Sequence, residues 1–185
     1  LLEFSIFLNP AFSAGVLAAA FAMFAIGGIQ LVTTQRFQLV VGFSPLEAGL
    51  LVAVIAVASL PTALLGGAFL HRVGLLALIA GGLAVAAGGV VVTVVGFQSS
   101  FGVLVLGLLV TGAGLGAAMS VASTAIIGNV PVRRAGMAAS LEEVSYEFGS
   151  LIAVSVLGSL LTAIYTASVV LPNGAPAAAG DGIAE

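Results

Sequence analysis

Three glutamates, Glu142, Glu143 and Glu147, stand close together in a stretch that is otherwise almost free of charge. An ionisable side chain in lipid is costly, so acids that persist there usually mark an ion or substrate path. On a helix, Glu143 and Glu147 lie one turn apart on the face that carries Ser150, and Glu142 points about a quarter turn away, beside Tyr146. Mutual repulsion and lost hydration both favour the protonated form of such a pair. The stretch therefore predicts a site that can hold either a proton or a lipophilic cation.

A simpler interpretation places these acids in water at the end of a helix. Residues 148–171 carry no charge and are long enough to span a bilayer alone. Against this, Arg133 and Arg134 already mark an interface, and apolar character resumes directly after them. Glu142 lies about 12 Å beyond Arg134 on helical rise. The residues alone leave both interpretations open and favour the functional one.

The composition is that of an integral membrane protein. The chain is 61% hydrophobic and 6% charged, with a mean hydropathy of +1.32. A soluble domain carries about 25% charged residues, so this chain cannot cover a water-facing surface. It has no Lys and only four Arg, and hence no basic patch to bind nucleic acid. Because Cys is absent, disulfides and thiolate chemistry are excluded.

Five apolar runs are long enough to cross a bilayer as helices. Barrel strands would alternate apolar with polar residues, and these runs do not. The sequence thus predicts an all-α bundle, followed by a flexible extracytoplasmic tail over residues 171–185. The expected spans cover residues 12–32, 46–70, 73–97, 101–127 and 137–170.

The basic residues predict the orientation. Cytoplasmic loops carry an excess of Lys and Arg, and four basic side chains fall on one side: His71, Arg72, Arg133 and Arg134. The other side holds only Arg36, balanced by Glu47. We therefore expect a cytoplasmic N-terminus. The chain begins at Leu1 with no visible signal peptide, which suggests a piece of a longer protein, and its Ala/Gly/Arg-rich, Lys-free composition suggests a bacterial inner-membrane protein.

Other polar side chains are weaker candidates. Gln30 and Thr34 share a helix face, where they could line a cavity or simply join helices, and Tyr146 and Ser150 are further candidate lining residues. His71 is the only His, so neither a His-Glu-x-x-His motif nor a His-partnered Ser nucleophile is present. We expect no enzyme, no cofactor and no metal site. The glycines within the spans predict close helix packing.

The order of motifs resembles the second half of major facilitator superfamily transporters, in particular the fourteen-span drug/proton antiporters that include the quaternary-ammonium resistance pumps. Four segments carry the resemblance: residues 7–13, residues 38–49, the glycine/basic loop 66–74, and residues 131–138 followed by 141–149. The loop motif places Gly67, His71, Arg72 and Gly74 at a cytoplasmic turn, with His71 where an Asp is usual.

This resemblance implies five helices of a six-helix bundle, with the N-terminal half of the transporter missing. It also implies proton-coupled export of drugs or lipophilic cations, with Glu143, Glu147 and Glu142 as coupling residues. Lipid, protons and cationic substrates are the implied partners. The alternative is a non-transporting scaffold or sensor subunit, in which all three acids would lie in water.

Overall fold

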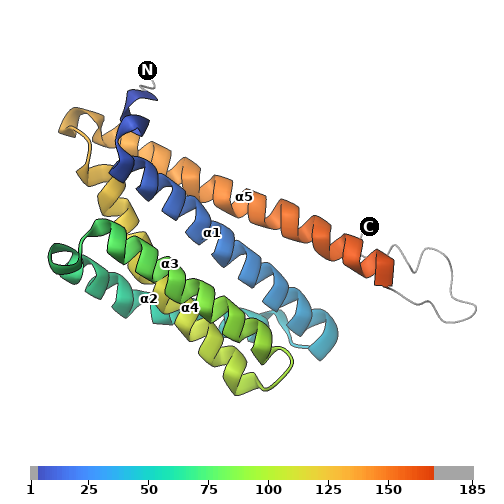
Figure 1. Ribbon diagram of the computed structural model, residues 1–185. Coiled ribbons are helices and arrows are strands. Elements are labelled where there is room, and N and C mark those ends of the chain that lie inside the picture. Colours follow the sequence, from blue (N-terminus) through green and yellow to red (C-terminus); the bar gives the residue numbers. More distant parts are fainter. Residues whose placement is uncertain (1–3, 169–185) are drawn as a thin grey trace, which may run out of the picture.

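The computed structural model describes residues 4–168, and these residues form helices joined by short turns, without strands. Five helices are long and apolar enough to cross a membrane, which confirms the predicted all-α membrane fold (Figure 1). The long helices are α1 (Pro10–Arg36), α2 (Pro45–Val73), α3 (Leu75–Gly96), α4 (Phe101–Gly128) and α5 (Ala135–Ser168). Three short helical segments accompany them: η1 (Phe4–Leu8), the π-turn η2 (Phe37–Val41) and η3 (Val132–Arg134).

The helices begin at side chains that cap free backbone N–H groups. The side chain of Asn9 accepts from the N–H of Ala11 at 3.0 Å, directly before Pro10. Ser44 and Glu47 form a reciprocal capping box at the start of α2, an arrangement that satisfies two otherwise unpaired donors. Helix starts of this kind can be predicted from sequence, because each cap is a short polar residue in front of an apolar run.

The first span is longer than its apolar run. A mostly polar run, residues 33–38, ends the hydrophobic stretch, but the backbone continues through it as α1 and then as the π-turn η2. The chain turns only at Gly42, whose φ of 81° lies in the left-handed region that favours glycine. Gly74, with φ 87°, makes the corresponding turn between α2 and α3. The predicted tail, residues 171–185, lies outside the described residues.

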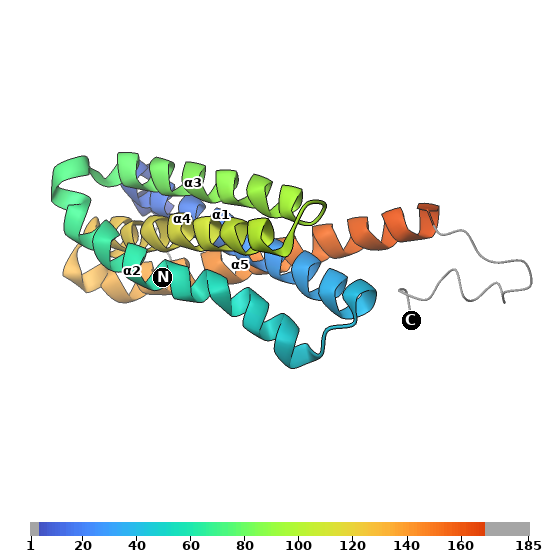
Figure 2. The same ribbon diagram turned by 90° about the horizontal axis from the view of Figure 1, so that it is seen from below.

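Helix α4 lies between α2 and α3, as Figure 2 shows from below. Towards α2 it presents Gly112 and Gly116, where a Cβ would collide with the carbonyl oxygens of Ile55 and Ser59. Small residues let helix backbones approach this closely in lipid, where no hydrophobic drive holds helices together.

Towards α3, α4 presents a Gly-x-x-x-Thr pair that meets an identical pair on α3. Gly89 faces the backbone of Thr111, and Gly107 faces the backbone of Thr93, because the two helices are antiparallel. Each threonine hydroxyl donates to the carbonyl of the glycine in its own helix, Thr93 to Gly89 at 2.9 Å and Thr111 to Gly107 at 2.8 Å. The threonines are thereby buried without leaving a donor unpaired.

Helices α1 and α5 form the other side of the bundle and run side by side in the same direction (Figure 1). Gly149 of α5 lies against the carbonyl oxygen of Ala20 in α1. Gly15 joins α1 to α4: a Cβ there would lie 2.9 Å from the carbonyl oxygen of Ala122. Helix α1 thus makes most of the contact between α5 and the rest of the bundle.

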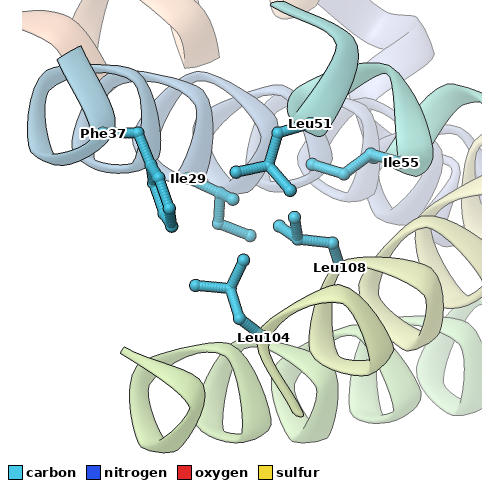
Figure 3. Packing of buried hydrophobic residues seen from close by; sticks show 6 residues of the cluster. All are labelled: Ile29, Phe37, Leu51, Ile55, Leu104 and Leu108. Atoms are coloured by element: carbon cyan, nitrogen blue, oxygen red, sulfur yellow. The ribbon is translucent and has the colours of Figure 1, made fainter. Parts of the chain in front are cut away.

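The end of the bundle opposite the basic loops closes on an aromatic side chain, Phe37. Its ring lies 4.9 Å from that of Phe43 and 6.2 Å from that of Phe101, centroid to centroid. Arg36 donates to the carbonyl oxygen of Phe97 at 3.0 Å and stacks over the Phe97 ring. Figure 3 shows the apolar cluster at this end, which comprises Ile29, Phe37, Leu51, Ile55, Leu104 and Leu108. We call it the Phe37 end, and the end with Arg72, Arg133 and Arg134 the basic end.

Candidate functional site

The three glutamates of α5 have two different environments. Glu142 is buried, and its carboxylate accepts a hydrogen bond from the hydroxyl of Tyr146 at 2.7 Å. Tyr146 is half-buried against an apolar cluster that includes Phe12, Ile126 and Ala138. This pair therefore faces the inside of the bundle at the junction of α1, α4 and α5.

Glu143 and Glu147 are exposed on a different face of α5, turned away from the one that Glu142 buries. The face they share is open along its length: Ser140 and Val154 are exposed too, and Ser150 is partly buried. Two carboxylates would not be stable against lipid hydrocarbon. Within a membrane, this face of α5 needs water or protein beside it.

The contact between α5 and α1 sets the depth of these acids. Ala20, which Gly149 touches, lies about 15 Å along α1 from its first residue at 1.5 Å rise per residue. Glu147 comes two residues before Gly149, so it lies about 12 Å inside the level at which α1 begins. Glu143 lies about one further turn towards the basic end. Of the two exposed acids, Glu147 is the deeper one.

Two grooves open on either side of one polar face of α1. The α1–α5 groove has a volume of about 500 Å³ and is lined by Gly27, Gln30, Leu31, Thr34, Gln35, Gln38, Leu39, Ser150 and Val154. The α1–α2–α4 groove, about 630 Å³, is lined by the polar side chains of Gln30, Thr34, Ser59 and Ser120 and by apolar side chains that include Val52, Ile55, Leu115 and Met119. Gln30 and Thr34 line both grooves, so they form the ridge between them.

Sequence reasoning did not single out Ser59 and Ser120, which also line the α1–α2–α4 groove. Isolated serines in apolar helices often bond only to their own backbone, as Ser59 does to the carbonyl of Ala56 at 2.8 Å. The sequence offers one signal for them, which is that each lies near a Pro or Gly within an apolar helix. Ser59 comes two residues before Pro61, and Ser120 follows Gly116 by one turn. Tyr146, by contrast, lies in the apolar cluster described above.

The loop motif lies at the basic end, away from the grooves. His71 and Arg72 are exposed in the last turn of α2, where basic side chains favour the negative helix end. Gly74 makes the turn into α3, and Gly67, one turn before His71, is exposed. Among residues 4–168, no three side chains of the metal-ligating types come together.

Comparison with known families settles what kind of bundle this is. The sequence model of the Major Facilitator Superfamily matches residues 6–180. The chain belongs to this superfamily. The match covers all five long helices and confirms the family resemblance drawn from the sequence motifs.

Among curated relatives, this superfamily member is 29% identical over 179 residues to the methyl viologen resistance protein SmvA of Salmonella typhimurium. It is 28% identical over 175 residues to the multidrug efflux pump LfrA of Mycolicibacterium smegmatis. It is 27% identical over 169 residues to the multidrug resistance protein Stp of Mycobacterium tuberculosis. The matches cover 94%, 94% and 91% of this chain but only 35%, 35% and 32% of those proteins. The chain thus spans about a third of the length of these relatives.

We expect the Glu142–Tyr146 hydrogen bond to stabilise the contact between α5 and the bundle. Tyr146→Phe would leave a buried carboxylate without its donor, which should lower the free energy of unfolding by about 1 kcal/mol. Thermal unfolding of the full-length protein in detergent would measure this loss. Tyr165→Phe is the matched control, because the hydroxyl of Tyr165 makes no hydrogen bond to the described residues. Equal losses for the two variants would show that the Glu142 contact contributes nothing.

Proposed function

We propose that the chain is part of a proton-coupled secondary transporter that exports drugs or lipophilic cations by alternating access. The observation that carries this proposal is the pair Glu143 and Glu147 on the open face of a membrane-length helix. Acids in such a position are explained by a cavity, and a cavity acid can exchange a proton for a cation. A bacterial inner-membrane setting, with the basic end cytoplasmic, agrees with the positive-inside rule.

The dimensions of the grooves support a drug-sized substrate. Ligand pockets for such molecules have volumes of roughly 300–1,000 Å³ and combine apolar walls with a few polar groups. The α1–α2–α4 groove, at about 630 Å³, fits this description with its apolar lining and the polar side chains of Gln30, Thr34, Ser59 and Ser120. We assign this groove to the wall of the substrate cavity.

The relatives' names agree with this substrate class. Methyl viologen is a flat dication with two quaternary nitrogens, and a protein named for resistance to it aligns with nearly the whole of this chain. Two other aligned proteins are named for multidrug efflux or resistance. The remaining two thirds of a protein of that length would supply the opposite wall of the cavity. Helices α2 and α5, which are the least buried of the five, are the ones we expect to face it.

The test is transport by the full-length protein in proteoliposomes. A proton gradient should drive methyl viologen or tetraphenylphosphonium across the membrane against its own gradient, and a protonophore should stop the movement. A protein that moves neither cation under any gradient is not this transporter.

A Cys at position 143 separates transport from a scaffold or sensor role. Under alternating access, this Cys in the full-length protein should react with a water-soluble thiol reagent added on either side of the membrane. In a scaffold or sensor subunit, the Cys would react from one side only.

A further inference from the structure

The α1–α5 groove differs in chemistry from the groove assigned to substrate. Its polar lining consists of three glutamines, a threonine and a serine, with no charged side chain: Gln30, Thr34, Gln35, Gln38 and Ser150. Amide and hydroxyl groups both donate and accept hydrogen bonds. Five such side chains can hold water along the groove by hydrogen bonds, beside the apolar Leu31, Leu39 and Val154.

The groove begins near the Phe37 end and stops close to Glu147. Gln38, in the π-turn η2, lies about 12 Å from Gln30 along the helix, with Thr34 midway. Across from them, Ser150 of α5 lies three residues, about 4.5 Å of helical rise, from Glu147. A Cβ on Gly27 would lie 3.8 Å from the backbone of Ser150, so α1 and α5 pack against each other at the level of these two residues.

The charged groups near this track are few and lie outside it. Arg36 is the nearest basic residue on α1 and lines an adjacent groove together with Gln35 and Leu39. Its guanidinium is held over Phe97, directly after α3, by the hydrogen bond and ring contact described above. Helix α1 has no other charged residue. On α5, Glu143 shares the open face with Glu147, whereas Glu142 and Tyr146 point into the bundle. A positive charge inside a narrow pore would repel protons, and none lines this groove.

We propose that the α1–α5 groove is a hydrated route by which protons from the Phe37 side reach Glu147. A proton added to water at Gln38 is passed along hydrogen-bonded water beside Thr34 and Gln30. At Ser150 the last water releases a proton to the Glu147 carboxylate, which becomes a neutral acid. This inference rests on the proposed function, and it gives the two grooves separate tasks: the α1–α2–α4 groove takes the cation and the α1–α5 groove takes the proton.

Two serines allow a matched test, because each lines one groove and has no assigned part in the other. The first variant of the full-length protein is Gln38→Leu/Ser150→Ala, and the second is Ser120→Ala. Two quantities are measured in proteoliposomes: the proton-driven rate of tetraphenylphosphonium transport as a function of pH on the Phe37 side, and tetraphenylphosphonium affinity at equilibrium without a gradient.

We expect the double variant to transport about tenfold more slowly at fixed pH, with affinity unchanged. Acidifying the Phe37 side by about one pH unit should restore its rate, because proton delivery is then faster by mass action; a folding defect would not recover in this way. Ser120→Ala should instead change affinity and leave the pH profile unchanged.

Three results would overturn the route. An unchanged rate in the double variant would show that the groove is idle. A loss of tetraphenylphosphonium affinity in the double variant would assign the groove to substrate, and a slow rate that acid does not restore would indicate a structural role. If the unmodified protein shows no proton-driven transport, the proposed function is wrong, and so is the route that rests on it. If the unmodified protein transports normally and any of those three results is found, only the route is wrong.

Discussion

Glutamine in place of Glu147 is expected to slow proton-driven export by the full-length transporter about a hundredfold, because a positioned proton-exchanging group typically contributes at least this much. Gln keeps the size of the side chain and its hydrogen bonds but cannot exchange a proton. Glu147 is the deeper of the two acids on the open face of α5, because the contact of Gly149 with Ala20 places it farther from the basic end than Glu143. Glu143→Gln should act in the same direction with a smaller effect, since Glu143 lies nearer the basic end. The measurement is the initial rate of cation export in proteoliposomes, together with the accompanying proton movement.

Glu142 and Glu47 supply the comparisons for this experiment. Glu142→Gln should change the rate far less, because an amide can still accept the hydrogen bond from Tyr146. Glu47→Gln, in the exposed capping box of α2, should leave transport unchanged. It should lower the free energy of unfolding by only a fraction of the roughly 1 kcal/mol that a helix cap contributes. If Glu142→Gln stopped proton movement and Glu147→Gln did not, the coupling group would be the buried acid, and the open face of α5 would have another purpose.

The number and type of the elements could be predicted from the sequence because each depends on local chemistry. Length and apolarity predict a membrane helix, and Asn9-Pro10 and Ser44-Pro45 mark helix starts that the structure shows as caps. The acids of α5 are conspicuous for the same reason, since a charge in an apolar run stands out without any knowledge of the fold.

Which side of each helix packs against the bundle could not be predicted in the same way. In a soluble protein, apolar periodicity tells which side of a helix packs, but these helices are apolar all round. Glu142 and Glu143 differ by only one position, yet one is buried against the bundle and the other exposed. Their difference arises from where Gly149 lets α5 meet α1, and a tertiary contact of this kind leaves no local signal. The grooves, formed from three helices or two, are hidden from sequence reasoning for the same reason.

Two neighbouring glycines show how much the packing around a residue can differ without any difference in the local sequence. Gly88 and Gly89 are adjacent and identical in sequence, but a Cβ on Gly88 meets nothing within 4 Å, whereas a Cβ on Gly89 collides with the backbone nitrogen of Thr111 and lies 2.8 Å from its Cα. We expect Gly89→Ala to lower the free energy of unfolding of the full-length protein by about 2 kcal/mol. Overpacking against backbone costs about 3 kcal/mol, offset by about 1 kcal/mol from the better helix propensity of Ala.

Gly88→Ala is the matched control and should be neutral or slightly stabilising, because it gains the same propensity with no collision. Unfolding of both variants in detergent, by heat or denaturant, measures the difference. The reciprocal Gly-x-x-x-Thr contact also predicts that Gly107→Ala, which would press on Thr93, resembles Gly89→Ala. Since the two substitutions strain the same α3–α4 contact, their costs should not add: once the helices have been moved apart by one methyl group, the second finds room. Equal costs for Gly88 and Gly89 would mean that α3 does not meet α4 along this face. Full additivity of the Gly89 and Gly107 costs would mean that each collision is relieved locally, without moving the helices apart.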